Sequence, residues 1–257
     1  VLSPAKTLAY ETLPVTRKAT QPIFLDQAKQ LVEDARQLSP EQIRDLMGVS
    51  EGIANLNHER FMNWHPDFSL DNAKQAVLAF KGDVYTGLQA ETLDSQAISF
   101  AQKHLRILSG LYGLLRPLDL MQPYRLEMGL KFQIRVCKNL YEFWGDTITE
   151  GVNASLAKSG SQVLLNLASN EYFKSVKPKQ VDAEIITPAF KDLKNDKYKM
   201  ISFSAKKARG TMARYIVTQA INDPEDLKSF TEDGYYFSEE QSTARDWVFL
   251  RDSPPVS

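Results

Sequence analysis

The chain has 257 residues, of which 43% are hydrophobic and 25% are charged, and its formal net charge is −1 at pH 7. This ordinary composition excludes a disordered, collagen-like or coiled-coil chain, and no apolar run reaches the length of about 18 residues that a transmembrane helix needs. Its single cysteine, Cys137, excludes a disulfide framework and every multi-cysteine zinc or iron–sulfur site. The first residues carry neither the basic nor the apolar region of a signal peptide, so we expect a cytoplasmic protein.

The first third of the chain predicts a series of helices. Apolar residues recur at helical spacing over residues 22–38, and Ser39 followed by Pro40 predicts the start of a second helix that runs through Met47. Ser50 opens a third helix, which ends before Pro66. Ser69 precedes a fourth predicted helix through Phe80.

Strands alternate with helices in the rest of the chain. We expect helices over residues 94–108, 144–158 and 205–220, and strands over 163–167, 184–190, 199–203, 235–237 and 247–250. Asn195-Asp196 predicts the turn of a hairpin. Because no linker or repeat interrupts the chain, we expect a single compact domain over residues 1–257. Its predicted class is α/β (mixed α+β), with a helical N-terminal third and a mixed sheet.

The near-zero net charge conceals an uneven distribution. Residues 101–140 carry 7 basic and 2 acidic side chains, residues 170–215 carry 11 and 5, and residues 222–257 carry 3 and 9. If the two basic segments converge in space, they form a surface that attracts anions. If acidic helices pack beside them, the charges cancel.

Most enzyme signatures are missing from the sequence. No glycine-rich phosphate loop or G-x-S-x-G motif occurs, and the His58-Glu59 pair has Met62 where a zincin helix has its second histidine. The other histidines, His65 and His104, lie on different predicted elements or beside Pro66, so we expect no metal site and no cofactor. Arg135 and Lys138 could lower the thiol pKa of Cys137, although an incidental cysteine is the simpler interpretation.

Four polar segments lie at the expected ends of strands or beside them, where sites of α/β proteins usually assemble. They are residues 3–7 with Lys6, residues 123–129 with Tyr124, Arg125 and Glu127, residues 166–177 with Asn170, Glu171 and Lys174, and residues 204–210 with Lys206, Lys207 and Arg209. Arginine and lysine at such places bind phosphate or carboxylate groups. Ion pairs such as Arg125–Glu127 and Glu171–Lys174 that only cap strand ends are the alternative.

Residues 105–117 have the outline of a helix-hairpin-helix. A predicted helix there runs into a segment with Gly110 and Gly113 and then a second apolar turn. In such a motif, backbone N–H groups of the hairpin hold a DNA phosphate without reading the bases. The glycines are three apart rather than two, and Pro117 limits a second helix, so an ordinary helical corner remains an alternative.

Seven collinear segments resemble the YaaA peroxide stress protein family: residues 3–7, 81–85, 108–117, 123–129, 143–145, 166–169 and 206–210. The resemblance runs from Ser3 to about Phe249. Members of that family open with Met and an apolar strand before the Ser-Pro-Ala-Lys-Thr segment, so we expect the chain to lack its first few residues. The resemblance implies a cytoplasmic protein of the peroxide response that protects DNA, limits free intracellular iron and binds duplex and branched DNA. It also implies an α/β fold with a positive cleft and a helix-hairpin-helix near residues 95–116.

Our leading hypothesis is therefore a DNA-binding protein of the oxidative stress response, without sequence readout and more plausibly non-enzymatic, with a role in DNA repair or protection. The predicted DNA contacts are backbone groups of the hairpin and cations of the two basic segments: Ser109, Gly110, Gly113, Arg116, Arg125, Lys174, Lys177, Lys206, Lys207 and Arg209.

An enzyme that acts on a nucleotide, a nucleobase or damaged DNA is the alternative hypothesis. Its candidate catalytic residues are Lys6, Tyr124, Glu127 and Glu171, close in sequence to Arg125 and Asn170. Either glutamate could act as a general base if burial raised its pKa, and Lys6 could act as a nucleophile if it were desolvated. Direct iron binding through His58, His65 and His104 is a third and weaker hypothesis.

Overall fold

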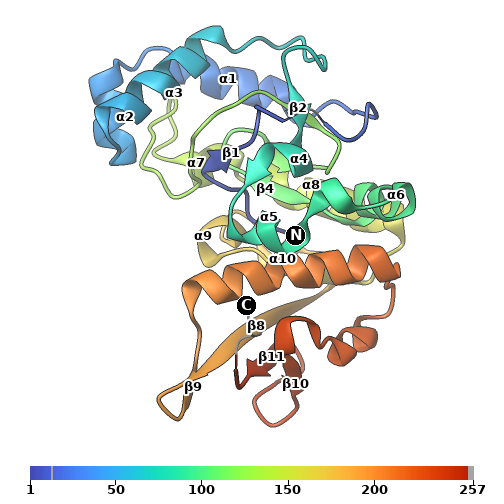
Figure 1. Ribbon diagram of the computed structural model, residues 1–257. Coiled ribbons are helices and arrows are strands. Elements are labelled where there is room, and N and C mark those ends of the chain that lie inside the picture. Colours follow the sequence, from blue (N-terminus) through green and yellow to red (C-terminus); the bar gives the residue numbers. More distant parts are fainter. Residues whose placement is uncertain (13, 254–257) are drawn as a thin grey trace.

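Helices fill much of the N-terminal third of the chain, and the longest strand, β8 (Glu184–Lys194), lies in its last third (Figure 1). The computed structural model describes residues 1–12 and 14–253. Three predicted helices are confirmed as α1 (Leu25–Ala35), α2 (Pro40–Met47) and α3 (Glu51–Asn63). Ser39 caps α2 in a reciprocal capping box with Gln42, which explains why this boundary could be predicted from the sequence.

The fourth predicted helix, over residues 69–80, is wrong. This segment contains strand β2 (Lys74–Gln75), a single helical turn α4 (Ala76–Ala79) and strand β3 (Phe80–Lys81). β2 pairs with β6 (Leu120–Met121), and β3 pairs with β1 (Thr7–Leu8). The buried ammonium of Lys74 donates hydrogen bonds to the carbonyls of Ala9 and Thr12. Pairing with distant segments therefore overrides the local helical periodicity.

The helix-hairpin-helix expected near residues 95–116 is not formed in this stretch. Helix α6 (Ser95–His104) is present, but strands β4 (Ile107–Ser109) and β5 (Gly113–Leu115) follow it as an antiparallel hairpin. A side chain at Gly110 would collide with the carbonyl oxygen of Leu126, and one at Gly113 would collide with the ring of Trp144. These two glycines therefore permit close packing in the interior.

The strands of the main sheet are mostly parallel. In the order β10 (Tyr236–Ser238), β11 (Asp246–Arg251), β8 (Glu184–Lys194) and β7 (Val163–Leu165), only β10 is antiparallel to its neighbour. Leu2 forms parallel bridges with both Leu167 and Ile107, so the first residues join this sheet to β4. β9 (Lys197–Lys199) pairs with β8 through the predicted hairpin, whose turn residues Asn195 and Asp196 both have positive φ.

Helix α10 (Ser202–Gln219) lies between β8 on one side and helix α5 (Asp83–Leu88) on the other (Figure 1). A side chain at Gly210 would come within 1.7 Å of the Val84 carbonyl oxygen, so glycine allows the two helices to touch. The strand expected at residues 199–203 is only partly right, because α10 already begins at Ser202. The remaining elements are η1 (Ala90–Thr92), α7 (Leu140–Trp144), α8 (Thr147–Ser159), α9 (Asn170–Phe173), η2 (Pro178–Gln180), η3 (Pro224–Ser229) and η4 (Glu232–Gly234).

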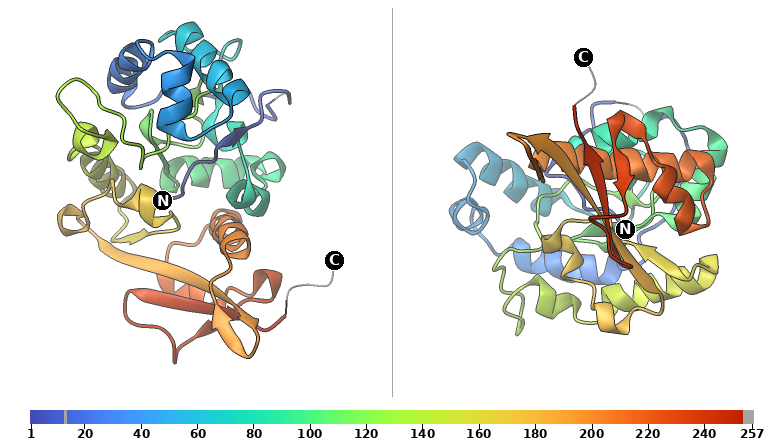
Figure 2. Two further views of the ribbon diagram at one scale, coloured as in Figure 1. Left: turned by 90° about the vertical axis from the view of Figure 1, so that its left-hand side faces the viewer. Right: turned by 90° about the horizontal axis from the view of Figure 1, so that it is seen from below.

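The mixed α/β class and the paired C-terminal strands are confirmed. Figure 2 (left) shows α1, α2 and α3 at the end of the molecule away from β8, β10 and β11. One hydrophobic cluster includes residues from Val1 to Phe249 and so spans both ends. Within the described residues, no helix is long and apolar enough to cross a membrane.

Candidate functional site

The parallel strands bring three of the four predicted polar segments to one edge of the sheet. The chain leaves Leu2 at Ser3 and leaves β7 toward Ser169, and Ser109 at the end of β4 lies 2.6 Å from the hydroxyl of Tyr124 in the segment 123–129. Leu2, β4 and β7 run in the same direction. The amide N–H of Ser169 donates a hydrogen bond of 2.8 Å to Oγ of Ser3. The phenol of Tyr85 donates one of 3.1 Å to the Ser3 carbonyl. Ligands of open parallel sheets bind at this carboxyl edge.

Glu127 lies at the centre of the edge cluster, by which we mean Ser3, Lys6, Ser109, Tyr124, Arg125, Glu127, Ser169 and Glu171. Its Oε1 lies 3.0 Å from Nζ of Lys6 and 3.1 Å from Nη2 of Arg125. The Glu127 side chain is only 9% exposed, whereas that of Lys6 is 64% exposed. Oε2 of Glu127 is buried and has no hydrogen-bond partner among the described residues. Both cations therefore meet one oxygen, and the second oxygen is left available for a donor.

Tyr124 contributes a buried phenol beside this carboxylate. Its hydroxyl lies 2.6 Å from Oγ of Ser109, which also accepts the amide N–H of Tyr112 at 2.9 Å. Burial raises the pKa of Tyr124 above its ordinary value, and the nearby charge of Glu127 adds to the increase. The phenol therefore stays protonated at neutral pH and can donate a hydrogen bond, but it is unsuited to act as a base.

Glu171 joins the cluster through the main chain. Its Oε1 accepts the N–H of Gly129 at 3.0 Å, and the side chain lies at the exposed side of the cluster. A side chain at Gly129 would come within 3.1 Å of the same oxygen, so glycine lets the carboxylate approach. The structure thus brings together Lys6, Tyr124, Glu127 and Glu171, the four residues of the enzyme hypothesis. Lys6 is exposed, however, so the desolvation that its role as a nucleophile required is not met.

The predicted DNA contacts of the hairpin lie inside the protein. Ser109, Gly110 and Gly113 are all buried, and the carbonyl of Gly110 accepts the indole N–H of Trp144 at 3.0 Å. As these residues stand, they cannot reach a phosphate at the surface.

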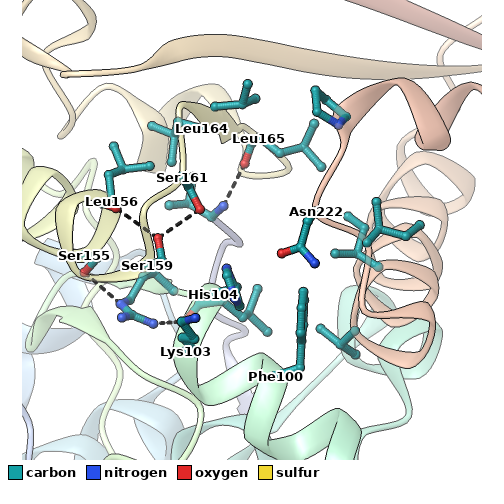
Figure 3. A pocket seen from close by; sticks show the side chains of 18 of the residues that line it. Phe100, Lys103, His104, Ser155, Leu156, Ser159, Ser161, Leu164, Leu165 and Asn222 are labelled. Carbon is teal, nitrogen blue, oxygen red and sulfur yellow. Dashed lines mark hydrogen bonds between the residues drawn. The ribbon is translucent and has the colours of Figure 1, made fainter.

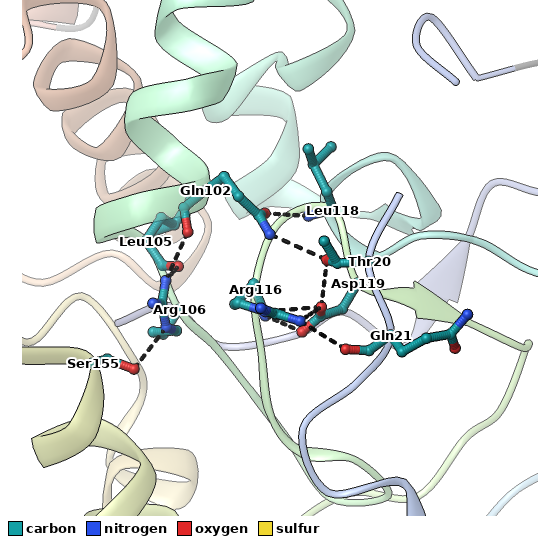
Figure 4. A network of polar contacts seen from close by, with 9 residues as sticks. All are labelled: Thr20, Gln21, Gln102, Leu105, Arg106, Arg116, Leu118, Asp119 and Ser155. Atoms are coloured by element: carbon teal, nitrogen blue, oxygen red, sulfur yellow. Dashed lines mark hydrogen bonds and ion pairs between the residues drawn. The ribbon is translucent and has the colours of Figure 1, made fainter. Parts of the chain in front are cut away.

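Arg116 is held by an internal carboxylate (Figure 4). Its guanidinium donates to Oδ1 of Asp119 at 2.7 Å and to the carbonyl of Gln21 at 2.8 Å, and Asp119 is fully buried. Arg106 belongs to the same region and donates to Ser155, while burial lowers its pKa to about 10. Arg106 and Arg116, the two cations of the first basic segment that are drawn in Figure 4, therefore stabilise the fold.

In the second basic segment, more of the cations have no acidic partner among the described residues. Lys177 pairs with Asp146, and Lys207 pairs with Asp233. Lys174, Lys206 and Arg209 have no ion pair with any described residue, although Lys174 lies 5.0 Å from the centre of the Tyr141 ring. Lys174 and Lys206 are exposed, and Arg209 is half-buried with its pKa lowered by burial.

Three exposed lysines of the β8–β9 hairpin were not among the predicted contacts. They are Lys194, Lys197 and Lys199, and none forms an ion pair with the described residues. Lys194 and Lys197 are direct cross-strand partners. The recurrence of lysine on both sides of the Asn195-Asp196 turn is a sequence signal that could have pointed to them.

The histidines are apart from one another. Nδ1 of His58 lies 3.1 Å from the Leu38 carbonyl, His65 lies after α3, and His104 stacks on Phe100. Within the described ranges, no group of three or more histidine, cysteine, aspartate and glutamate side chains could hold a metal ion.

A largely apolar cavity of about 380 Å³ lies between α6, α8, β7 and α10 (Figure 3). Ser155, Ser159 and Ser161 in its wall are hydrogen-bonded to protein groups. The amino group of Val1 lies in its wall and donates to the Leu165 carbonyl. We assign no ligand to this cavity.

Comparison with known proteins identifies the family. A family model described as "Peroxide stress protein YaaA" matches residues 1–241. UPF0246 proteins of Shewanella baltica strains OS195 and OS223 are each 57% identical to the chain, over 251 and 252 residues, which is 98% of this chain and 98% of each relative. The family match covers the edge cluster, α10 and all strands from β1 to β10. The chain therefore belongs to the YaaA peroxide stress protein family.

Proposed function

We propose that this protein acts in the peroxide stress response by binding DNA through its phosphates, without reading the bases. The supporting observation is the basic hairpin surface, by which we mean Lys194, Lys197 and Lys199, together with Lys206 and Arg209 on α10, the next helix along the chain, two cations without an ion pair among the described residues. Lys194 and Lys197 face each other directly across two strands. Like charges in that position destabilise a sheet, so an anionic partner would relieve a cost that the free protein carries.

The geometry of this surface suits a phosphate backbone. Its three hairpin lysines lie on one face of a two-stranded ribbon, because Lys194 and Lys197 are partners and Lys199 is two residues further on. α10 begins three residues after β9, and Lys206 and Arg209 are neighbours at i and i+3 on that helix. DNA duplexes or bubbles are thus the proposed partners, and protection of DNA with limitation of free iron is the proposed outcome, as the family resemblance implies.

Fluorescence anisotropy with duplex and bubbled DNA at several salt concentrations tests this proposal. The variant Lys194→Ala/Lys197→Ala/Lys199→Ala should bind all sequences more weakly. Its plot of log K against log salt should be shallower by about 0.9 for each phosphate that the variant no longer neutralises. The double variant Lys206→Ala/Arg209→Ala should behave in the same way.

The matched control removes three exposed lysines elsewhere: Lys18, Lys29 and Lys158. It lowers the net charge by the same amount as the hairpin variant and should retain most of the affinity. Equal affinities of the hairpin variant and the wild-type protein, with thermal unfolding unchanged, would contradict the proposed surface. Weak and salt-insensitive binding by the wild-type protein would contradict DNA binding itself.

The edge cluster supports a second candidate function, an activity on a nucleotide or nucleobase. The specific observation is Oε2 of Glu127, a buried acceptor without a donor beside two cations. A ligand with an N–H or O–H group could reach this oxygen, and its negative charge would face Lys6. Nucleosides and nucleoside phosphates should then bind the wild-type protein and bind Lys6→Ala and Glu127→Gln at least tenfold more weakly. Absence of binding at millimolar concentration would exclude this activity.

A further inference from the structure

A second cavity, of about 400 Å³, lies beside the C-terminal half of α3. Arg60 and Asn63 of that helix line it, together with His65 and the segment that contains Gln122. None of these residues belongs to the edge cluster or to the basic hairpin surface. The size is that of a pocket for a small molecule.

Arg60 is a cation without a counterion in this cavity. It is half-buried and forms no ion pair with any described residue, and its Nη1 donates a long hydrogen bond of 3.4 Å to Oδ1 of Asn57. Asn57 is itself buried and anchored, because its amide donates to the Ile53 carbonyl at 2.8 Å. Burial lowers the pKa of Arg60, as expected for a guanidinium that has lost water without gaining a carboxylate. With half of its surface out of water and no carboxylate of the described residues paired with it, the guanidinium is available for an anion.

His65 supplies a second donor at the same cavity. Gln122 fixes its main chain, because Oε1 accepts the His65 N–H and Nε2 donates to the His65 carbonyl, each at 3.0 Å. The N–H of Asp67 donates to Nδ1 of the ring at 3.2 Å. The same Nδ1 lies 3.6 Å from Oδ2 of Asp67, and the ring is 62% exposed. Both of these contacts are at Nδ1, so Nε2 is left to donate to a ligand, and it has no hydrogen-bond partner among the described residues.

The remaining polar groups define the rest of the ligand. The amide of Asn63 forms no hydrogen bond with the described part of the chain and adds another donor. Glu59 is the one carboxylate that lines the cavity, and it is exposed. Donors thus predominate around Arg60, while Glu59 offers an acceptor for a hydroxyl or amine. A sugar phosphate matches both: its phosphate oxygens accept hydrogen bonds from the donors, and its sugar hydroxyls donate to Glu59.

We propose that this cavity binds the phosphate group of a sugar phosphate, with Arg60, His65 and Asn63 as donors. The phosphate belongs either to a free nucleotide or to the backbone of DNA, and the chemistry of recognition is the same for both. The cavity does not depend on the basic hairpin surface for this role.

Isothermal titration calorimetry with adenosine 5′-monophosphate and with inorganic phosphate tests the site. The wild-type protein should bind both, and Arg60→Gln should bind them at least tenfold more weakly. Asn63→Asp provides a second variant that keeps the arginine and its packing but places a negative charge in the cavity, and it should also lose binding. Wild-type protein that binds neither probe at millimolar concentration would overturn the proposal.

Two matched variants separate this site from general charge effects. Arg17→Gln removes an exposed arginine, and Asn55→Asp makes the same change as Asn63→Asp on α3, at about 12 Å along the helix axis. Both should bind the probes as the wild-type protein does. Equal losses in these controls and in Arg60→Gln would also overturn the proposal.

Titration with DNA identifies the source of the phosphate. If Arg60→Gln loses adenosine 5′-monophosphate and also lowers DNA affinity, while the nucleotide competes with DNA, the cavity holds a backbone phosphate. If the variant loses the nucleotide and its DNA affinity is unchanged, the cavity holds a free nucleotide. Both results support the site, and the second would do so even if the protein bound no DNA at all.

Discussion

Nζ of Lys6 lies 3.0 Å from Oε1 of Glu127, and this contact ties the first residues of the chain to the segment that follows β6. The pair is unequal, because the Lys6 side chain is 64% exposed and that of Glu127 is 9% exposed. Arg125, which is 17% exposed, shares the same oxygen at 3.1 Å. The buried carboxylate therefore depends for its stability mainly on Arg125, while Lys6 remains accessible to a ligand.

Removing the charge of Glu127 should destabilise the protein far more than removing that of Lys6. Glu127→Gln leaves Arg125 nearly buried without a counterion, and we expect a loss of about 2 kcal/mol, below the range for a fully buried pair. Lys6→Ala breaks an exposed contact and should cost less than about 1 kcal/mol. Urea unfolding of both variants measures the difference. Equal losses would show that the ion pair with Lys6 is the one that stabilises the carboxylate.

The gathering of polar groups at the sheet edge could be predicted from the sequence because it depends on strand ends. The apolar run at residues 163–167 predicted a buried strand. The carboxyl ends of parallel strands lie at one edge of their sheet. The asymmetry around Glu127 could not be predicted, since it depends on which of its oxygens meets Arg125. Only the tertiary structure determines which oxygen of Glu127 contacts Arg125.

The errors of the sequence-based prediction have a common physical cause. Periodicity describes one segment, whereas residues 74–81 take their conformation from pairing with distant strands, and the hairpin at 107–115 is bridged at Ile107 to Leu2. Gly110 and Gly113 were interpreted as part of a turn that binds phosphate. Glycine is needed at these positions because Leu126 and Trp144 pack against them. The hairpin at Asn195-Asp196 was predicted correctly, because a two-residue turn with positive φ is specified locally.

The ion pair between Asp192 and Arg251 should contribute strongly to stability. Nε of Arg251 lies 2.6 Å from Oδ1 of Asp192, both side chains are 9% exposed, and the guanidinium lies over the ring of Tyr235 at 4.4 Å. Asp192→Asn leaves Arg251 without its counterion between β8 and β11, and we expect a loss of about 3 kcal/mol in the free energy of unfolding.

The matched comparison is the exposed pair Arg245–Glu184, with a separation of 3.8 Å. Glu184→Gln should change the stability by less than about 0.5 kcal/mol, because exposed pairs contribute little. Chemical unfolding of both variants at low and high salt checks the contrast. A loss in Asp192→Asn as small as that in Glu184→Gln would contradict the prediction.

Two substitutions of glycine by alanine in helices should have opposite effects. Gly210→Ala places a methyl group 1.7 Å from the Val84 carbonyl oxygen, so α5 and α10 must separate. We expect a loss of more than about 2 kcal/mol, comparable to overpacking of a core. Gly52→Ala meets nothing within 4 Å on α3 and should stabilise the protein by about 0.5–1 kcal/mol. Thermal unfolding should thus shift down for the first variant and up for the second, and shifts of the same sign would contradict the proposed packing.

His104 should make the protein less stable in mild acid. Burial lowers its pKa below the ordinary value of 6.5, and Lys103 and Arg106 lower it further. The unfolded chain therefore binds a proton at a pH at which the folded protein does not, so the free energy of unfolding falls as pH decreases from 7.5 through 6.5. The fall ends below the pKa of the folded state, where both states carry the proton.

Urea unfolding at pH 7.5 and 5.5 should show a smaller decrease in the free energy of unfolding for His104→Gln than for the wild-type protein. His58→Gln, which changes another half-buried histidine, serves as the comparison. An unchanged decrease in His104→Gln would mean that other groups cause the acid sensitivity.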